Sequence, residues 1–209
     1  MSVTAALVAY CAAAALLTIT PGLDTALVLR TGAAEGVRRA GFAAAGIVLG
    51  CLVWGAAVAL GLGALLAASQ TAFTVLKWVG AAYLAWLGVN LILKPRRSFT
   101  LEGAVTNAGG GDLAWLRRGL LTNLLNPKVG VFYVSFLPQF LPEGVAAGPF
   151  MFLLAALHAG MGGLWLGLLT IATRPLARIL RRPAAIAWLD RATGGIFLTF
   201  AARLALARG

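Results

Sequence analysis

Charged residues are scarce in this sequence, and acidic residues above all. Its 209 residues include 6 Asp and Glu against 17 Lys and Arg, and charged residues make up 11%, compared with about 25% in soluble domains. No charged residue occurs between Arg39 and Lys77, or between Glu143 and Arg174. A helix crosses the hydrocarbon core of a bilayer in about 20 residues, so each interval can hold a complete transmembrane helix. The scarcity of charge excludes an ordinary soluble domain and predicts an all-α membrane protein.

Residues that commonly carry catalysis or bind metals are also scarce. The chain has two cysteines, Cys11 and Cys51, and one histidine, His158. The cysteines form neither a CxxC pair nor a metal-ligand spacing, and we interpret them as structural thiols. The sequence contains no HExxH, GxSxG, P-loop or GxGxxG motif. We therefore expect no metal, no cofactor and no enzymatic activity.

Basic residues concentrate in short connections between apolar segments. Thirteen of the 17 lie in three such regions: Arg30, Arg38 and Arg39; Lys94, Arg96, Arg97, Arg117 and Arg118; Arg174, Arg178, Arg181, Arg182 and Arg191. Cytoplasmic loops retain Lys and Arg, so these regions are expected inside the cell and both termini outside. They form no basic face with interleaved aromatic residues, so we predict no nucleic-acid partner. The start Met1-Ser2-Val3-Thr4 has no basic residue and indicates a retained first helix rather than a cleaved signal.

The apolar segments predict six transmembrane helices in two halves. Their expected ranges are 3–29 (interrupted near Pro21), 40–68, 73–93, 115–141 (interrupted at Pro127), 146–173 and 187–207. A polar cytoplasmic linker, 94–112, separates residues 1–93 from 113–207 within one transporter domain. Since each half has three helices, a second copy must insert upside down, which predicts two inverted repeats. Proline placement, helix number and charge pattern carry this prediction, because residue identity between the halves is weak.

Each half opens with a helix that a proline interrupts. The segments are Thr20-Pro21-Gly22-Leu23-Asp24 and Asn123-Leu124-Leu125-Asn126-Pro127-Lys128. Proline removes a backbone donor, which frees the carbonyls of Leu17 and Asn123. Thr20 and Asn126 each precede a proline, the pattern of an N-cap before a new helix. Such helix starts suit a carboxylate, and Gly22 leaves room for its close approach.

Asp24 and Lys128 place opposite charges beside these two prolines. A charge at membrane depth costs several kcal/mol, so the pair predicts a polar site shared by both halves. Two alternatives stay open: Asp24 pairs with Arg30 at the cytoplasmic rim, or Lys128 extends its ammonium to the membrane surface. His158 is either a proton relay or a hydrogen-bonding residue between helices.

Small residues at helical spacing predict close helix packing. Gly46 and Gly50 form one GxxxG motif, and Gly163 and Gly167 form another. In lipid, such motifs allow helix backbones to approach each other. They are frequent in membrane proteins and indicate no particular function.

The chain resembles the lysine exporter family and its homoserine/threonine exporter branch, the LysE/RhtB type. The resembling stretches, which follow the family's order along nearly the whole chain, are residues 20–24, 76–88, 119–128, 136–140 and 189–194. One departure is Leu23, where the family motif usually reads Pro-Gly-Pro. The resemblance implies a six-helix inner-membrane exporter of amino acids or close derivatives, coupled to proton entry. It also maps Asp24 and the Asn126-Pro127-Lys128 segment onto the family's characteristic positions.

Other classes remain as alternatives. A heavy-metal exporter of the same superfamily would need a set of soft ligands, and two isolated cysteines argue against it. A membrane thiol oxidoreductase would need cysteines beside the prolines, where Gly22 and Lys128 stand. A structural protein would not need opposed charges at depth. Within the exporter interpretation, small neutral amino acids are favoured over lysine, because Asp24 is the one acidic residue expected at depth. Monomer and homodimer are both open.

Overall fold

The protein is helical throughout the part that the structure describes. A computed structural model describes residues 2–68, 70–95, 110–172 and 182–206. Its helices are α1 (Val3–Ile19), α2 (Leu23–Ala34), α3 (Val37–Ala68), α4 (Gln70–Leu93), α5 (Asp112–Leu124), α6 (Pro127–Phe136), the 3₁₀ helix η1 (Leu137–Phe140), α7 (Ala147–Ile171) and α9 (Pro183–Leu206). Each of the six expected segments is helical, and the all-α prediction is confirmed for these residues.

Two helices are long and apolar enough to cross a membrane alone. They cover Val37–Gly61 in α3 and Ala147–Ile171 in α7. The pair α1 and α2 qualifies as a third span if it is counted together, with a bend of 48° at its break. In α4 the apolar stretch is shorter, Trp78–Leu93. Length and composition thus identify two or three spans among the described residues.

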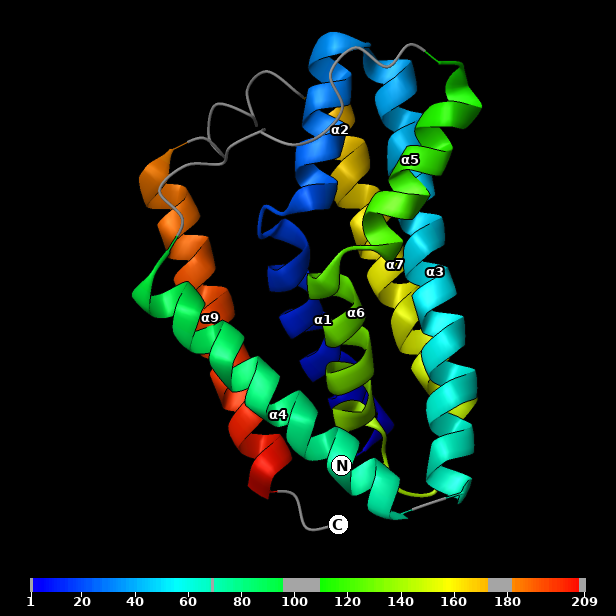
Figure 1. Ribbon diagram of the computed structural model, residues 1–209, viewed down its shortest axis with the longest axis vertical. Helices are drawn as coiled ribbons and strands as arrows, with labels where there is room; N and C mark the ends of the chain where they lie inside the picture. The colour runs from blue at the N-terminus through cyan, green and yellow to red at the C-terminus, as the bar shows by residue number, and fades with distance from the viewer. Residues whose placement is uncertain (1, 69, 96–109, 173–181, 207–209) are drawn as a thin grey trace.

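The helices form an elongated bundle with a separate helix pair on one side. In Figure 1, α3, α5 and α7 run together along the long axis, while α4 and α9 cross it diagonally as a pair. The pair is tightly packed, because a Cβ on Gly88 would lie 2.8 Å from the Gly194 carbonyl oxygen. The start of α1 and the end of α9 lie towards the same end of the molecule (Figure 1).

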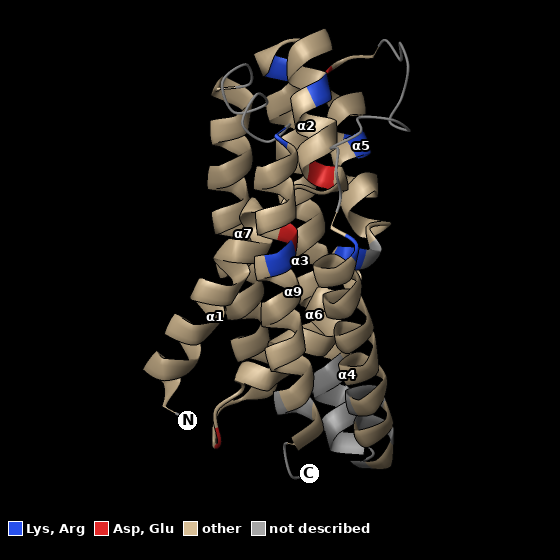
Figure 2. Ribbon diagram, turned by 90° about the vertical axis from the view of Figure 1, so that its left-hand side faces the viewer, with Lys and Arg blue, Asp and Glu red and all other residues tan. Residues whose placement is uncertain are grey.

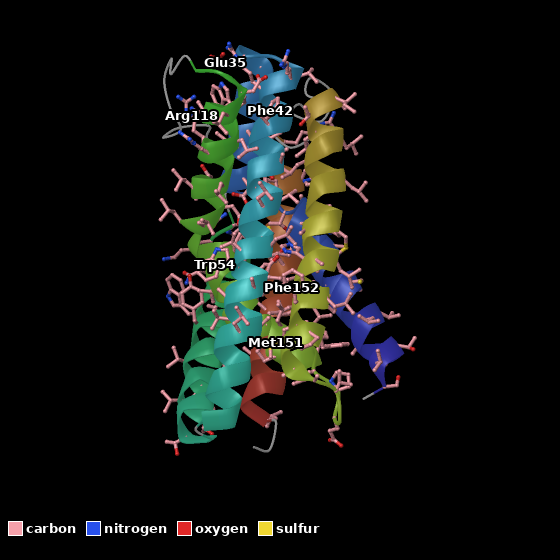
Figure 3. The ribbon with its side chains drawn as sticks, turned by 90° about the vertical axis from the view of Figure 1, so that its right-hand side faces the viewer. Glu35, Phe42, Trp54, Arg118, Met151 and Phe152 are labelled. Carbon is pink, nitrogen blue, oxygen red and sulfur yellow. The ribbon has the colours of Figure 1, made fainter. Side chains whose placement is uncertain are left out.

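Basic residues gather towards the opposite end. The Lys and Arg residues coloured in Figure 2 lie in the half away from the chain ends and at mid-height. Glu35 and Arg118 are both labelled at that end in Figure 3. There Arg38 forms an ion pair with Asp112 at 2.7 Å, and Arg39 forms one with Glu35. These contacts tie the start of α3 to α2 and α5.

Glycine contacts join α3 to α5. A Cβ on Gly46 would overlap the Leu116 carbonyl, and one on Gly119 would overlap the Ala43 carbonyl. The close approach expected at Gly46 and Gly50 is therefore confirmed. The expectation for the second motif is wrong at Gly167, where a Cβ would meet no atom within 4 Å. A GxxxG motif gives a close contact only where another helix lies on that face.

Two apolar clusters lie on either side of the helix breaks. One contains an aromatic group in which Tyr10, Phe132, Phe136, Phe140 and Phe200 join α1, α6, η1 and α9. The other joins α2, α3, α5 and α7 around Val28, Ala43, Trp115 and Leu169. The aromatic cluster fixes α6 against α1, which brings the second broken helix against the first.

Candidate functional site

The first break is an unwound segment of three residues. Thr20 is the C-cap of α1, and its hydroxyl donates to the Leu16 carbonyl at 2.7 Å. Gly22 is the N-cap of α2 and supplies no side-chain cap. The prediction that Thr20 caps a new helix is therefore wrong. Pro21 lies in the unwound segment, so the new helix begins after Gly22 rather than at the proline.

The second break follows the predicted capping pattern. Asn126 is the N-cap of α6, its side-chain oxygen accepts from the Lys128 N–H at 3.1 Å, and Pro127 occupies the first turn. The Asn126 carbonyl accepts from the Val129 N–H at 3.0 Å. These bonds occupy the amides of the first turn, so α6 does not offer its helix start to a carboxylate as expected. The Asn123 carbonyl, expected to be free, accepts from the Asn126 N–H at 3.1 Å.

Asp24 is held from the opposite half of the chain. Its Oδ2 accepts from Asn123 Nδ2 at 2.9 Å, and its Oδ1 accepts from Asn126 Nδ2 at 3.5 Å. Arg30 stands six positions further along α2, which places it on a different face of that helix. The two amides beside Pro127 thus orient the carboxylate beside Pro21.

Lys128 completes the end of α1. Its Nζ donates to the Leu17 carbonyl at 3.4 Å and to the Thr20 carbonyl at 3.3 Å. Pro21 was expected to free the Leu17 carbonyl, and the structure places an ammonium beside it. Gly22 lies close by, since a Cβ there would be 3.9 Å from the same Nζ. Each break is therefore bridged by a charged residue from the other half.

These residues border one small polar cavity. Thr20, Gly22, Asp24, Asn126, Lys128 and His158 all line it, and its volume is about 70 Å³. Its walls include Leu17 and Val129 from the first apolar cluster and Ile47 and Leu166 from the second. Binding pockets for small molecules usually measure about 300–1,000 Å³. The cavity has room for a few water molecules and must widen to admit an amino acid.

His158 is buried on the α7 side of this cavity. It is 7% exposed, and its Nδ1 lies 3.0 Å from the Tyr133 hydroxyl. Its ring also packs 5.2 Å from the Phe132 ring, centroid to centroid. Of the two roles left open, the hydrogen bond between helices is present, here between α7 and α6.

An apolar cavity that opens to the protein surface borders Asn126 on another side. It measures about 380 Å³ and lies among α3, α4, α5 and α6, with walls that include Trp54, Tyr83, Val131 and Val134. In Figure 3 the Trp54 side chain extends sideways from α3. Asn126 lines both cavities, so the α5–α6 break lies between the polar cavity and the apolar cavity.

Two polar residues of α9 escaped the sequence analysis. Asp190 is 0% exposed, although its neighbour Arg191 suggested a position in a cytoplasmic connection. Asp24 is therefore not the one acidic residue that the helix bundle encloses. The Thr193 hydroxyl lies 2.6 Å from that of Thr20, so α9 contacts the first break directly. Both residues lie in α9, which begins at Pro183, four residues before the expected start.

Comparison with known proteins places the chain in a family. Residues 15–208 match the model of the LysE type translocators. A leucine efflux protein of Enterobacter sp. (strain 638) is 30% identical over 200 residues, covering 94% of this chain and 93% of that protein. A homoserine/homoserine lactone efflux protein of Salmonella typhi is 31% identical over 201 residues, covering 96% of both chains. An uncharacterized membrane protein of Vibrio cholerae is 32% identical over 200 residues, with the same coverage. No solved structure matches the chain. On this match, which spans both helix breaks, the protein belongs to the LysE-type translocator family.

Proposed function

We propose that this protein exports small neutral amino acids or close derivatives across the inner membrane, driven by proton entry. The observation that carries the proposal is one cavity bordered by Asp24 and Lys128, each at the break of a helix. An amino acid carries an ammonium and a carboxylate, and a site of opposite charges matches both. The names of relatives that export leucine and homoserine support the same substrate class.

The ionic groups of the substrate have distinct partners in this proposal. Asp24 receives the ammonium or carries the coupling proton. Lys128 receives the carboxylate together with the start of α2, whose N-cap Gly22 supplies no side-chain cap. A helix start carries partial positive charge and N–H donors, so it suits a carboxylate. This replaces the expected carboxylate site at α6, where the amides are occupied.

The substrate side chain is assigned to the apolar cavity beside Asn126. Its walls are aliphatic and aromatic, and its volume of about 380 Å³ accommodates a leucine-sized group. Buried Asp190 removes the earlier argument against basic substrates. The preference for neutral amino acids now rests on this apolar lining and on the leucine efflux relative.

The membrane arrangement in this proposal has six spans as two inverted repeats. The broken pairs α1–α2 and α5–α6 open the two halves, and α3, α4, α7 and α9 supply the other spans. The basic end of Figure 2 faces the cytoplasm, and the end with both termini faces outward. His158 is the candidate proton relay, because it lines the same cavity as Asp24.

Transport by purified protein in proteoliposomes tests the function. Vesicles are loaded in turn with labelled leucine, threonine, homoserine or lysine, and release is measured with and without an imposed pH gradient. We expect gradient-dependent release of the neutral amino acids above that of protein-free vesicles. Release of none of the four, or of lysine far above leucine and threonine, would contradict the proposal.

A further inference from the structure

Asn123 connects three helices beside the polar cavity. It belongs to α5 and is 0% exposed. Its Nδ2 donates to Asp24 Oδ2 on α2 at 2.9 Å and to Cys51 Sγ on α3 at 3.5 Å. Its Oδ1 is buried and accepts no hydrogen bond from the described residues. A buried acceptor without a donor lowers the stability of the folded protein, so the packing around this amide must hold it in place.

Gly50 is the residue against which this amide rests. A Cβ on Gly50 would lie 2.5 Å from Asn123 Oδ1, 2.8 Å from its Cβ and 2.9 Å from its Cγ. The Cβ of Asn123 is fixed to the α5 backbone, so rotation of the amide alone cannot relieve the overlap. A methyl group at position 50 must displace both the amide and the local backbone of α5.

Gly46 provides a comparison within the same interface. It lies one helical turn before Gly50 on α3, and a Cβ there would overlap the Leu116 carbonyl and lie 2.8 Å from the Leu120 nitrogen. Those atoms belong to the α5 backbone and do not contact Asp24. The two glycines therefore share the helix contact, but only Gly50 touches the side chain that binds Asp24.

We infer that Gly50 is a positioning residue for transport, which holds the Asn123 amide against Asp24 and so fixes the carboxylate that meets the substrate and the proton. This inference rests on the proposed function, in which Asp24 binds the ammonium or carries the coupling proton. The titratable groups that share the cavity with Asp24 are Cys51 on α3, Lys128 on α6 and His158 on α7. The three atoms that lie nearest to a Cβ on Gly50 all belong to Asn123.

The test compares Gly50→Ala with Gly46→Ala in proteoliposomes. The measured quantities are the KM of leucine efflux and the midpoint of its pH dependence, both normalised to folded protein. We expect Gly50→Ala to raise KM by about tenfold or to move the midpoint by about one pH unit, the effect of losing one charge-assisted hydrogen bond. We expect Gly46→Ala to lower the folded yield and to leave both quantities within about twofold of wild type.

A second pair of variants separates positioning from packing. Asn123→Gly removes both the amide and the Cβ that a methyl group at position 50 would overlap, so Gly50→Ala added to it should cause no further change in KM or midpoint. If Gly50→Ala alone gives no folded protein, the double variant should recover folded yield because the methyl group then has space. The inference is overturned if Gly50→Ala keeps the wild-type KM and midpoint, or if Gly46→Ala changes them equally. It is also overturned if the double variant changes KM or midpoint further, or does not recover folded yield.

The same measurement separates this inference from the proposed function. A wild type that exports no amino acid overturns both. A wild type with proton-coupled efflux beside an unchanged Gly50→Ala overturns the positioning role and leaves the proposed function intact.

Discussion

The Nζ of Lys128 lies 3.3 Å from the carbonyl oxygen of Thr20, so the lysine after the second break completes the helix that ends at the first. Asp24 makes the reciprocal contact, from the first break to Asn123 and Asn126 at the second. The two broken helices are therefore joined by two crossed polar contacts. A substrate that binds either charged group competes with one of these contacts, which links binding to the relative position of the breaks.

Replacing Lys128 by Met should lower stability as well as transport. The carbonyls of Leu17 and Thr20 would lose a donor, and an unsatisfied buried acceptor costs about 1–3 kcal/mol. Thermal unfolding in detergent and the monodisperse fraction on size-exclusion chromatography measure the loss. Lys94→Met, at an exposed residue just after α4, is the control and should behave as wild type. Unchanged stability in Lys128→Met would contradict the capping role.

Enlarging a side chain in the apolar cavity should change selectivity. Val134→Phe fills part of its wall, and we expect leucine efflux to fall about 3- to 10-fold relative to threonine efflux, because the larger side chain loses more room. Val53→Phe, at an exposed position of α3, is the matched control. If Val134→Phe lowers leucine and threonine efflux equally, this cavity does not receive the substrate side chain. The same conclusion follows if the ratio of leucine efflux to threonine efflux is equal in Val134→Phe and Val53→Phe.

The orientation predicts which connections a membrane-impermeant thiol reagent can reach. In a background without Cys11 and Cys51, Ser98→Cys in the linker should stay unlabelled in intact cells and react after permeabilisation. Glu143→Cys, in the exposed connection before α7, should react without permeabilisation. The reverse pattern would place the termini inside the cell and refute the assignment from basic residues.

The helix breaks were predictable from the sequence because proline acts locally. Pro21 and Pro127 remove backbone donors wherever they stand. Asn126 caps α6 by accepting from the N–H of Lys128, two residues further along the chain. Thr20 was wrongly predicted to be the N-cap of the new helix, because α2 begins only after Gly22. The proline alone does not determine how many residues are unwound. The contacts of Asn123 with Asp24, and of Thr20 with Thr193, join residues far apart in the chain. Tertiary packing decides these contacts, as it does the burial of Asp190 on α9.

Proton-coupled efflux by Asp24→Asn shows whether Asp24 acts at the shared site. Asparagine keeps a side-chain oxygen for Asn123 Nδ2, so this variant should fold while it loses the charge. Efflux is measured in proteoliposomes with a pH gradient and normalised to inserted protein, with Asp112→Asn as the control because Asp112 pairs with Arg38 away from the cavity. We expect Asp24→Asn to abolish gradient-driven efflux and Asp112→Asn to retain it. Lys128→Met added to Asp24→Asn should not restore efflux. If Asp24→Asn exports at close to the wild-type rate under the gradient, Asp24 does not act at the shared site.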